Sequence, residues 1–301
     1  IRIQPDHAGA YSNLGVALQK QGRLEESIDA YQQAIRIQPD HAGAYSNLGV
    51  ALKEQGRLGE SIDAYQQAIR IQPDHAEAYS NLGNVLQEQG RLGESIDVCQ
   101  QAIRIRPNYA EAYNNMGITL KDQSKLDEAI ETYKKCISLK PDYAEVHSNI
   151  GEVLRDQGRY DESVAAYKRA LELDPSLPLA NYSLAVYLYD SGDLPQALRY
   201  FQQSQYADWQ ERSLYCLYKT ERFEEFKEGL DQLKKARHSS PFLATLAGHY
   251  AENFGTVNDY NFCKNPLDLV CHVQVPELKG DSELLKQLLA DIERADIEEK
   301  S

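Results

Sequence analysis

The sequence predicts an all-α fold, a right-handed superhelix of stacked two-helix units (an α-α solenoid) with a C-terminal helical cap and a short irregular tail. Three observations predict it: prolines recur at a fixed spacing, near-identical segments recur at that same spacing, and each segment carries two apolar stripes. The recurring prolines are 34 residues apart: Pro5, Pro39, Pro73, Pro107, Pro141 and Pro175. A unit this short cannot bury its own apolar face, so neighbouring units must stack.

The repetition is close enough to define the unit directly. Residues 7–40 recur at 41–74 with only three changes, and further copies start at residues 75, 109 and 143. Within the first copy, apolar residues at helical spacing form one stripe between Ala8 and Leu18 and a second between Leu24 and Ile35. Gly22 separates the stripes, because glycine adopts a positive φ at no steric cost. Each unit is therefore expected to be a pair of helices.

The end of each unit also follows from its residues. Pro39 prevents the second helix from continuing into the next unit, and Asp40 is placed to cap the following helix or to favour its positive end. Gly15 and Ala34 are small where two helices must approach closely, and Tyr31 is large enough to fill the facing space. This small-and-large complementarity is expected to hold each pair together.

These residues resemble the tetratricopeptide repeat (TPR) family, whose pattern is an aromatic residue, Leu-Gly, Ala or Ser, Tyr, Ala and Pro. The first unit matches it with Tyr11, Leu14, Gly15, Ser27, Tyr31, Ala34 and Pro39. The resemblance is strong over residues 1–177 and weaker over 178–211, where Asn181 replaces the aromatic residue and Trp209 replaces the proline.

The repeat register predicts the organisation of the whole chain. Residues 1–7 are read as the end of a preceding repeat. Six units of 34 residues follow, at 8–41, 42–75, 76–109, 110–143, 144–177 and 178–211. Residues 212–254 are read as a degenerate seventh repeat and a capping helix over Pro241–Phe254. Residues 255–301 are read as a linker with an amphipathic helix over 281–294, the start of a truncated domain.

The resemblance also indicates which surface binds a partner, because the first helix of each TPR unit lines the concave groove. One groove position is asparagine in five successive units: Asn13, Asn47, Asn81, Asn115 and Asn149. An asparagine side chain offers one acceptor and one donor group, which match the N–H and C=O of an extended peptide. This row, which we name the asparagine ladder, resembles that of the O-GlcNAc transferase TPR array. Asn84 and Asn114 are further candidates for peptide binding beside it.

Two other interpretations of this surface stay open. The asparagines could be passive copies of a duplicated unit, or could bond the backbone of their own helices. The edge formed by Lys20, Glu54, Glu88, Asp122, Asp156 and Asp190 is largely acidic. It indicates a neutral or basic peptide, unless these acids are only a solvated face. Lysine and arginine are missing where Hsp90- and Hsp70-binding TPR proteins place a carboxylate clamp, so an acidic chaperone tail is not expected.

Composition excludes several classes of partner. The net charge is −14, which opposes broad binding to nucleic acid or to an anionic membrane. No run of 18 apolar residues is present to span a bilayer. The five cysteines lack a disulfide framework, which favours a reducing, cytoplasmic compartment.

Signs of catalysis or of a cofactor are also missing. Cys263, Cys271 and His272 form the one tight group of thiol and imidazole residues, but its spacing does not suit zinc. No Gly-rich phosphate loop or G-x-S-x-G motif occurs. We therefore expect no cofactor, no metal and no enzymatic activity within these residues.

The tail suggests an alternative function. Residues 262–268 and the Leu-Leu segment after Glu283 resemble the junction that follows TPR arrays in some 2-oxoglutarate/Fe(II) oxygenase-like proteins. The iron-binding His-x-Asp of such an oxygenase is not found here.

Three hypotheses follow. The leading one is a protein-interaction scaffold that binds an extended peptide or a partner protein. The alternative is the substrate-recruiting arm of a larger oxygenase-like enzyme or glycosyltransferase. The third is self-association, because near-identical repeat ends can stack between molecules.

Overall fold

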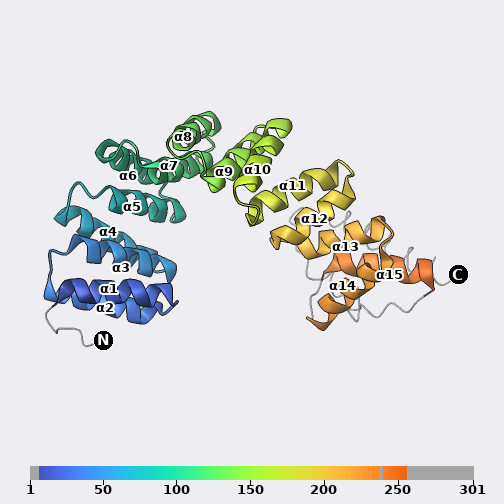
Figure 1. The fold of residues 1–301 in the computed structure, drawn as a ribbon, viewed down its shortest axis with the longest axis horizontal. Helices are drawn as coiled ribbons and strands as arrows, with labels where there is room; N and C mark the ends of the chain where they lie inside the picture. Colours follow the sequence, from blue (N-terminus) through green and yellow to red (C-terminus); the bar gives the residue numbers. More distant parts are fainter. Residues whose placement is uncertain (1–6, 237–239, 256–301) are drawn as a thin grey trace, which may run out of the picture. The chain divides into compact units, whose positions relative to one another are not determined.

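The structure is a computed structural model that describes residues 7–236 and 240–255 (Figure 1). Within those ranges every regular element is an α-helix, which confirms the predicted all-α solenoid class. The chain divides into two compact parts, residues 1–210 and 211–301.

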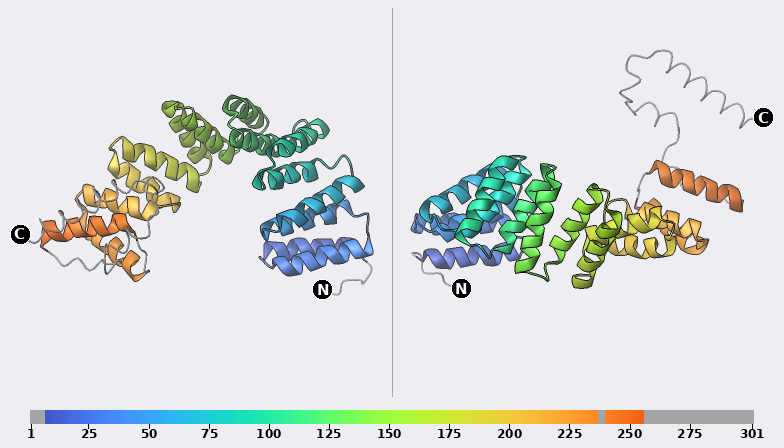
Figure 2. Two further views of the ribbon diagram at one scale, coloured as in Figure 1. Left: turned by 180° about the vertical axis from the view of Figure 1, so that it is seen from behind. Right: turned by 90° about the horizontal axis from the view of Figure 1, so that it is seen from above.

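In the first part of the chain, the described helices form pairs in sequence order. Its helices are α1 (Ala8–Lys20), α2 (Leu24–Ile37), α3 (Ala42–Glu54), α4 (Leu58–Ile71), α5 (Ala76–Glu88), α6 (Leu92–Ile105), α7 (Ala110–Asp122), α8 (Leu126–Leu139), α9 (Ala144–Asp156), α10 (Tyr160–Leu173), α11 (Pro178–Asp190) and α12 (Leu194–Ser204). The two helices of a pair pack side by side, as α1 and α2 do in Figure 2. Each second helix also contacts the first helix of the next pair, so the pairs form a continuous stack.

Three further helices follow: α13 (Trp209–Lys219), α14 (Phe223–Lys235) and α15 (Pro241–Phe254). These three pack through aromatic side chains, since Tyr218 contacts Phe226 and Phe223 contacts Phe254 edge-to-face with ring centroids 4.6 Å apart. The expected helix over Pro241–Phe254 is thereby confirmed. Of the predicted linker at 255–301, residues 256–301 lie outside the described residues, and these include the expected amphipathic helix and the segments that resemble an oxygenase junction.

Glycine and tyrosine set the distance between the helices of a pair. A Cβ atom on Gly49 of α3 would lie 2.8 Å from ring atoms of Tyr65 on α4, closer than such atoms approach in proteins. Tyr65 is 1% exposed. Beside this contact the buried Ser61 hydroxyl donates a 2.7 Å hydrogen bond to the Gly49 carbonyl oxygen. The same tyrosine-on-glycine contact joins α1 to α2, α7 to α8 and α9 to α10.

The third unit departs from this pattern. Cys99 of α6 stands where the first, second, fourth and fifth units have tyrosine, and its sulfur fills the space that a Cβ on Gly83 would occupy. Cys99 and Cys136 are both fully buried, so both cysteines belong to the core. Burial raises the pKa of each thiol to about 12, which keeps both in the neutral form.

The turn within each pair uses a left-handed residue. Gly22 lies in the first of these turns with φ of 73°, as its place between the two stripes predicts. In the fourth unit a serine, Ser124, takes this conformation with φ of 60°. The turn geometry is therefore kept even where the residue that adopts it most easily is absent.

The expected capping role of Asp40 is wrong. The N-cap of α3 is His41, whose Nδ1 accepts a 3.2 Å hydrogen bond from the Ala44 backbone N–H. His7 and His75 cap α1 and α5 in the same way. The helix starts one residue later than an Asp40 cap requires, and a neutral imidazole nitrogen serves as the acceptor that a carboxylate or hydroxyl more often provides.

Candidate peptide-binding face

The asparagine ladder lies on the first helices, turned away from the second helices. Gly15 faces Tyr31 of the same unit, and Asn13 precedes it by two residues. Two residues correspond to a rotation of roughly 200° about a helix. An asparagine at this position must therefore point to the opposite side of the helix from the Gly–Tyr contact, and the same argument holds in each of the five units.

The ladder side chains differ in how far they reach solvent. Asn13 is exposed, whereas Asn47, Asn81, Asn115 and Asn149 are partly exposed. Of the two neighbouring candidates, Asn84 is partly exposed and Asn114 is buried. The structure thus brings the ladder to one side of successive first helices, with Asn114 beneath rather than at the surface.

Two ladder residues also connect neighbouring units. The Asn115 amide nitrogen donates to the backbone oxygen and the hydroxyl of Ser80, at 3.1 and 3.0 Å. The Asn149 amide nitrogen donates to the Asn114 side-chain oxygen at 3.0 Å. Within the described part of the chain, Asn47 and Asn81 form no comparable bond. Their donor and acceptor groups are therefore uncommitted within the described residues. Asn115 and Asn149 keep their side-chain oxygens, and the Asn149 amide nitrogen also keeps a second N–H, because its bond to Asn114 uses only one.

A second row of side chains follows the ladder near the C-terminal end of each first helix. We name it the bridge row, and it consists of Gln19, Lys53, Gln87, Lys121 and Arg155. Gln19 donates to Glu54 of the next unit at 2.8 Å, and Lys53 pairs with Glu88 at 2.9 Å. Lys53 also donates to Asn84, one of the candidate binding residues. The bridge row therefore ties the face of one unit to the face of the next.

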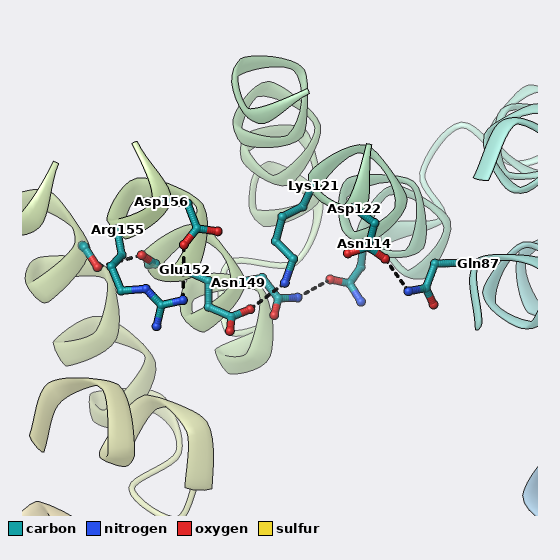
Figure 3. A network of polar contacts seen from close by, with 10 residues as sticks. Gln87, Asn114, Lys121, Asp122, Asn149, Glu152, Arg155 and Asp156 are labelled. Atoms are coloured by element: carbon teal, nitrogen blue, oxygen red, sulfur yellow. Dashed lines mark hydrogen bonds and ion pairs between the residues drawn. The ribbon is translucent and has the colours of Figure 1, made fainter. Parts of the chain in front are cut away.

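Figure 3 shows this network in the middle of the array. Gln87 donates to Asp122, and Lys121 pairs with Glu152 at 2.9 Å. At the end of the row Arg155 pairs with Asp156 of its own unit at 3.3 Å. The acidic edge was predicted from the sequence, but these bridges were not. The sequence feature that could have predicted the bridges is an amide or cationic side chain that recurs 31 or 35 residues before an acidic residue.

The charge of the face follows from these pairs. Each lysine or arginine of the bridge row is already paired with an acid. Glu54 and Asp122 receive only neutral amide donors from the row, so their negative charge is not compensated there. Asp190 is exposed at the same position in the sixth unit. The face is therefore polar and anionic.

Metal binding and membrane spanning have no support in the described ranges. There, no cluster of three or more metal-ligating side chains occurs. None of the helices described is both long and apolar enough to cross a bilayer. Cys263, Cys271 and His272 lie outside the ranges that the structure describes.

Comparison with known proteins identifies the family. The tetratricopeptide repeat family matches residues 6–74 and 74–142, and a TPR repeat family matches residues 151–192. Together these matches span more than half of the chain, so the chain belongs to the tetratricopeptide repeat family. A search of curated proteins found no match.

Solved structures support the same fold. PilF of Pseudomonas aeruginosa is 20% identical and has a TM-score of 0.60, over 69% of this chain and 97% of its own. The Cut9–Hcn1 complex of the APC/C is 16% identical with a TM-score of 0.64, over 71% of this chain and 44% of that chain. A thermophilic TPR protein of Thermus thermophilus is 22% identical with a TM-score of 0.52, over 66% of this chain and 100% of its own. At these identities the similarity concerns the fold.

Proposed function

We propose that this TPR array is a protein-interaction scaffold that holds an extended peptide segment along the asparagine ladder. The observation that carries the proposal is the presentation of asparagine side chains, exposed or partly exposed, on one side of five successive first helices. Each amide can accept from a peptide N–H and donate to a peptide C=O. A row of them would bind the backbone of a ligand and leave its side chains free to vary.

The state of each asparagine refines the proposal. Asn47 and Asn81 have both amide groups uncommitted within the described residues. The Asn115 amide nitrogen already donates to two oxygens of Ser80, so this residue would act as an acceptor for a peptide N–H group. Asn149 spends one of its two N–H groups on Asn114, so it would accept from a peptide N–H and could still donate to a peptide C=O. The buried Asn114 would orient Asn149 rather than touch the peptide.

No chemical step is assigned to these residues. The tyrosines of the pair interfaces are held neutral, because burial raises the pKa of Tyr65 and Tyr133 above the ordinary value. The thiols of Cys99 and Cys136 are likewise neutral and enclosed. A binding role is therefore favoured over catalysis by the described helices.

The proposal is tested with peptides selected from a phage-displayed library of random linear sequences. The affinity of a selected peptide is measured by fluorescence anisotropy for the parent chain and for Asn47→Ala/Asn81→Ala. Each lost hydrogen bond is expected to weaken binding by roughly 0.5–1.5 kcal/mol. These two residues are chosen because their substitution breaks no bond between units.

The matched control is Gln32→Ala/Gln66→Ala, which removes two exposed amides from the second helices α2 and α4. It should leave the affinity unchanged. If the ladder variant binds as tightly as the parent chain while its helical circular dichroism is intact, the proposal is wrong.

A further inference from the structure

A groove of about 370 Å³ opens on the other side of the array, between the second helices α6 and α8. Its floor is apolar, with Ile96 on α6 and Met116 and Leu120 on α7. Its rim is charged, with Lys125 before α8 and Glu128 and Glu131 on α8. This volume lies within the range of small-ligand pockets and is ample for one large side chain with its neighbouring backbone.

The floor of the groove is more open than the corresponding place in the first, second and fourth units. Ile28, Ile62 and Ile130 are between 2% and 6% exposed, whereas Ile96 at the same position is only partly buried. Met116 is also partly exposed, and it is the single methionine of the chain. Methionine adapts its shape to different partners, which suits a floor that receives an apolar side chain.

The rim lacks an ion pair that the first, second, third and fifth units form. In these units the arginine just before the second helix donates two hydrogen bonds to the carboxylate of a glutamate three residues later. The pairs are Arg23–Glu26, Arg57–Glu60, Arg91–Glu94 and Arg159–Glu162. In the fourth unit the arginine is replaced by Lys125. Within the described residues Lys125 and Glu128 form no ion pair with each other or with another group.

The unpaired charges of Lys125 and Glu128 therefore lie beside the open apolar floor. Glu131, also on the rim, pairs only with Lys134 at 2.7 Å, and both side chains are largely exposed. Because Glu131 is paired, Glu128 is the carboxylate of the rim that is free to receive a cation, on a chain whose net charge is −14. A free carboxylate beside an apolar floor on an acidic chain favours an occupant that carries positive charge next to an apolar side chain.

We propose that this groove is a second docking site, whose occupant is a basic peptide segment of a partner protein. One aliphatic side chain contacts Met116, and an adjacent lysine or arginine pairs with Glu128. Lys125 donates to a carbonyl oxygen of the peptide backbone. The site is separate from the asparagine ladder, so either proposal can fail while the other holds.

The single methionine makes the test direct. The chain is labelled with ¹³C at the methionine methyl group, and the one resonance of Met116 is followed during titration with acetyl-Lys-Leu-Lys-amide. A saturable shift is expected. Acetyl-Lys-Ser-Lys-amide lacks the aliphatic side chain and acetyl-Glu-Leu-Glu-amide reverses the charge, so neither should shift the resonance. An absent shift, or an equal shift with all three peptides, would overturn the proposal.

Variants locate the binding. Gln100→Trp places a large ring at an exposed position on the groove wall and should abolish the shift. Gln66→Trp makes the same change at the corresponding position of α4 and should not. Loss of binding in both variants, or in neither, contradicts the assignment to this groove.

A second pair of variants tests the charge. Glu128→Gln should weaken binding roughly two- to fivefold, in line with the loss of an exposed ion pair. Glu162→Gln, at the same position of the fifth unit, should leave the affinity unchanged because that carboxylate lies outside the groove. Lys125→Arg should also weaken binding, because an arginine at this position is expected to pair with Glu128, as the arginines of the first, second, third and fifth units pair with their glutamates. Glu128 would then no longer be free to bind the peptide. Unchanged affinity in both Glu128→Gln and Lys125→Arg would overturn the proposal.

Discussion

The hydroxyl of Tyr31 on α2 donates a 3.0 Å hydrogen bond to the side-chain oxygen of Gln19 on α1. In the fourth unit the bridge row has Lys121 at this position, and its ammonium group pairs with Glu152 of the next unit. The buried hydroxyl of Tyr133 has no hydrogen-bond partner there. The hydrogen bond that Tyr31 forms in the first unit is therefore missing at Tyr133.

This relationship predicts opposite effects for the same substitution. Tyr31→Phe should lower stability by about 1 kcal/mol, because it breaks a formed hydrogen bond. Tyr133→Phe should be neutral or stabilising, because it removes a buried group that already lacks a partner. Urea unfolding followed by circular dichroism compares the two midpoints. An equal loss in both variants would show that the two hydroxyls are equivalent.

The contact between Gly49 and Tyr65 predicts that two glycine-to-alanine substitutions change the stability in opposite directions. Gly49→Ala should destabilise by roughly 1–3 kcal/mol, because the added methyl group would overlap the ring of the buried Tyr65. Gly59→Ala on α4 meets nothing within 4 Å, so helix propensity alone should raise stability by up to about 1 kcal/mol. Thermal melting checks both. A tolerated Gly49→Ala would mean that the tyrosine ring can move aside.

The serine beneath each glycine gives a paired prediction. Ser61→Ala removes a buried 2.7 Å hydrogen bond to the Gly49 carbonyl and should cost roughly 0.5–1.5 kcal/mol. The fourth unit has Ala129 at this position, so Ala129→Ser should gain the corresponding bond to the Gly117 carbonyl. The urea midpoint is expected to fall in the first variant and to rise or stay level in the second. A lower urea midpoint in both variants would mean that the helices of the fourth unit pack too closely to accommodate a hydroxyl group at residue 129.

Alkaline pH should weaken the third unit through Cys99. Burial raises the pKa of this thiol to about 12 from an ordinary value near 9.0. The stabilising contribution of the neutral thiol is therefore complete below pH 9.0 and declines as the pH rises towards 12. Cys99→Ala should flatten the decline in unfolding free energy between about pH 9 and about pH 10.5, measured by urea titration. An identical decline in the variant would assign it to other groups.

The helix pairs were predictable because the same apolar stripes, glycine and proline recur in several successive repeats. The stripe of Tyr31 and Ala34, the stop at Gly22 and the break at Pro39 are local signals that tertiary packing does not reverse. The cap was not predictable from Asp40, because its neighbour His41 also carries an acceptor and only the backbone position of the helix start decides between them.

The candidate face was predictable in outline only. The spacing of Asn47 and Asn81 places them on one side of their helices, which a helical period suffices to show. The bond from Asn149 to Asn114 and the bridge from Lys121 to Glu152 join different units. Such contacts depend on the distance and angle between neighbouring pairs, which the sequence of one unit does not specify.

The proposed binding of the peptide backbone is tested by comparing a selected peptide with analogues N-methylated at single backbone positions. Asparagine side chains that hold the peptide backbone require its N–H groups. Methylation at the contacting positions is expected to abolish binding measured by fluorescence anisotropy, while alanine substitution of the peptide side chains there should change the affinity little. Full affinity in every N-methylated analogue, with strong losses in the alanine series, would contradict the proposed backbone binding.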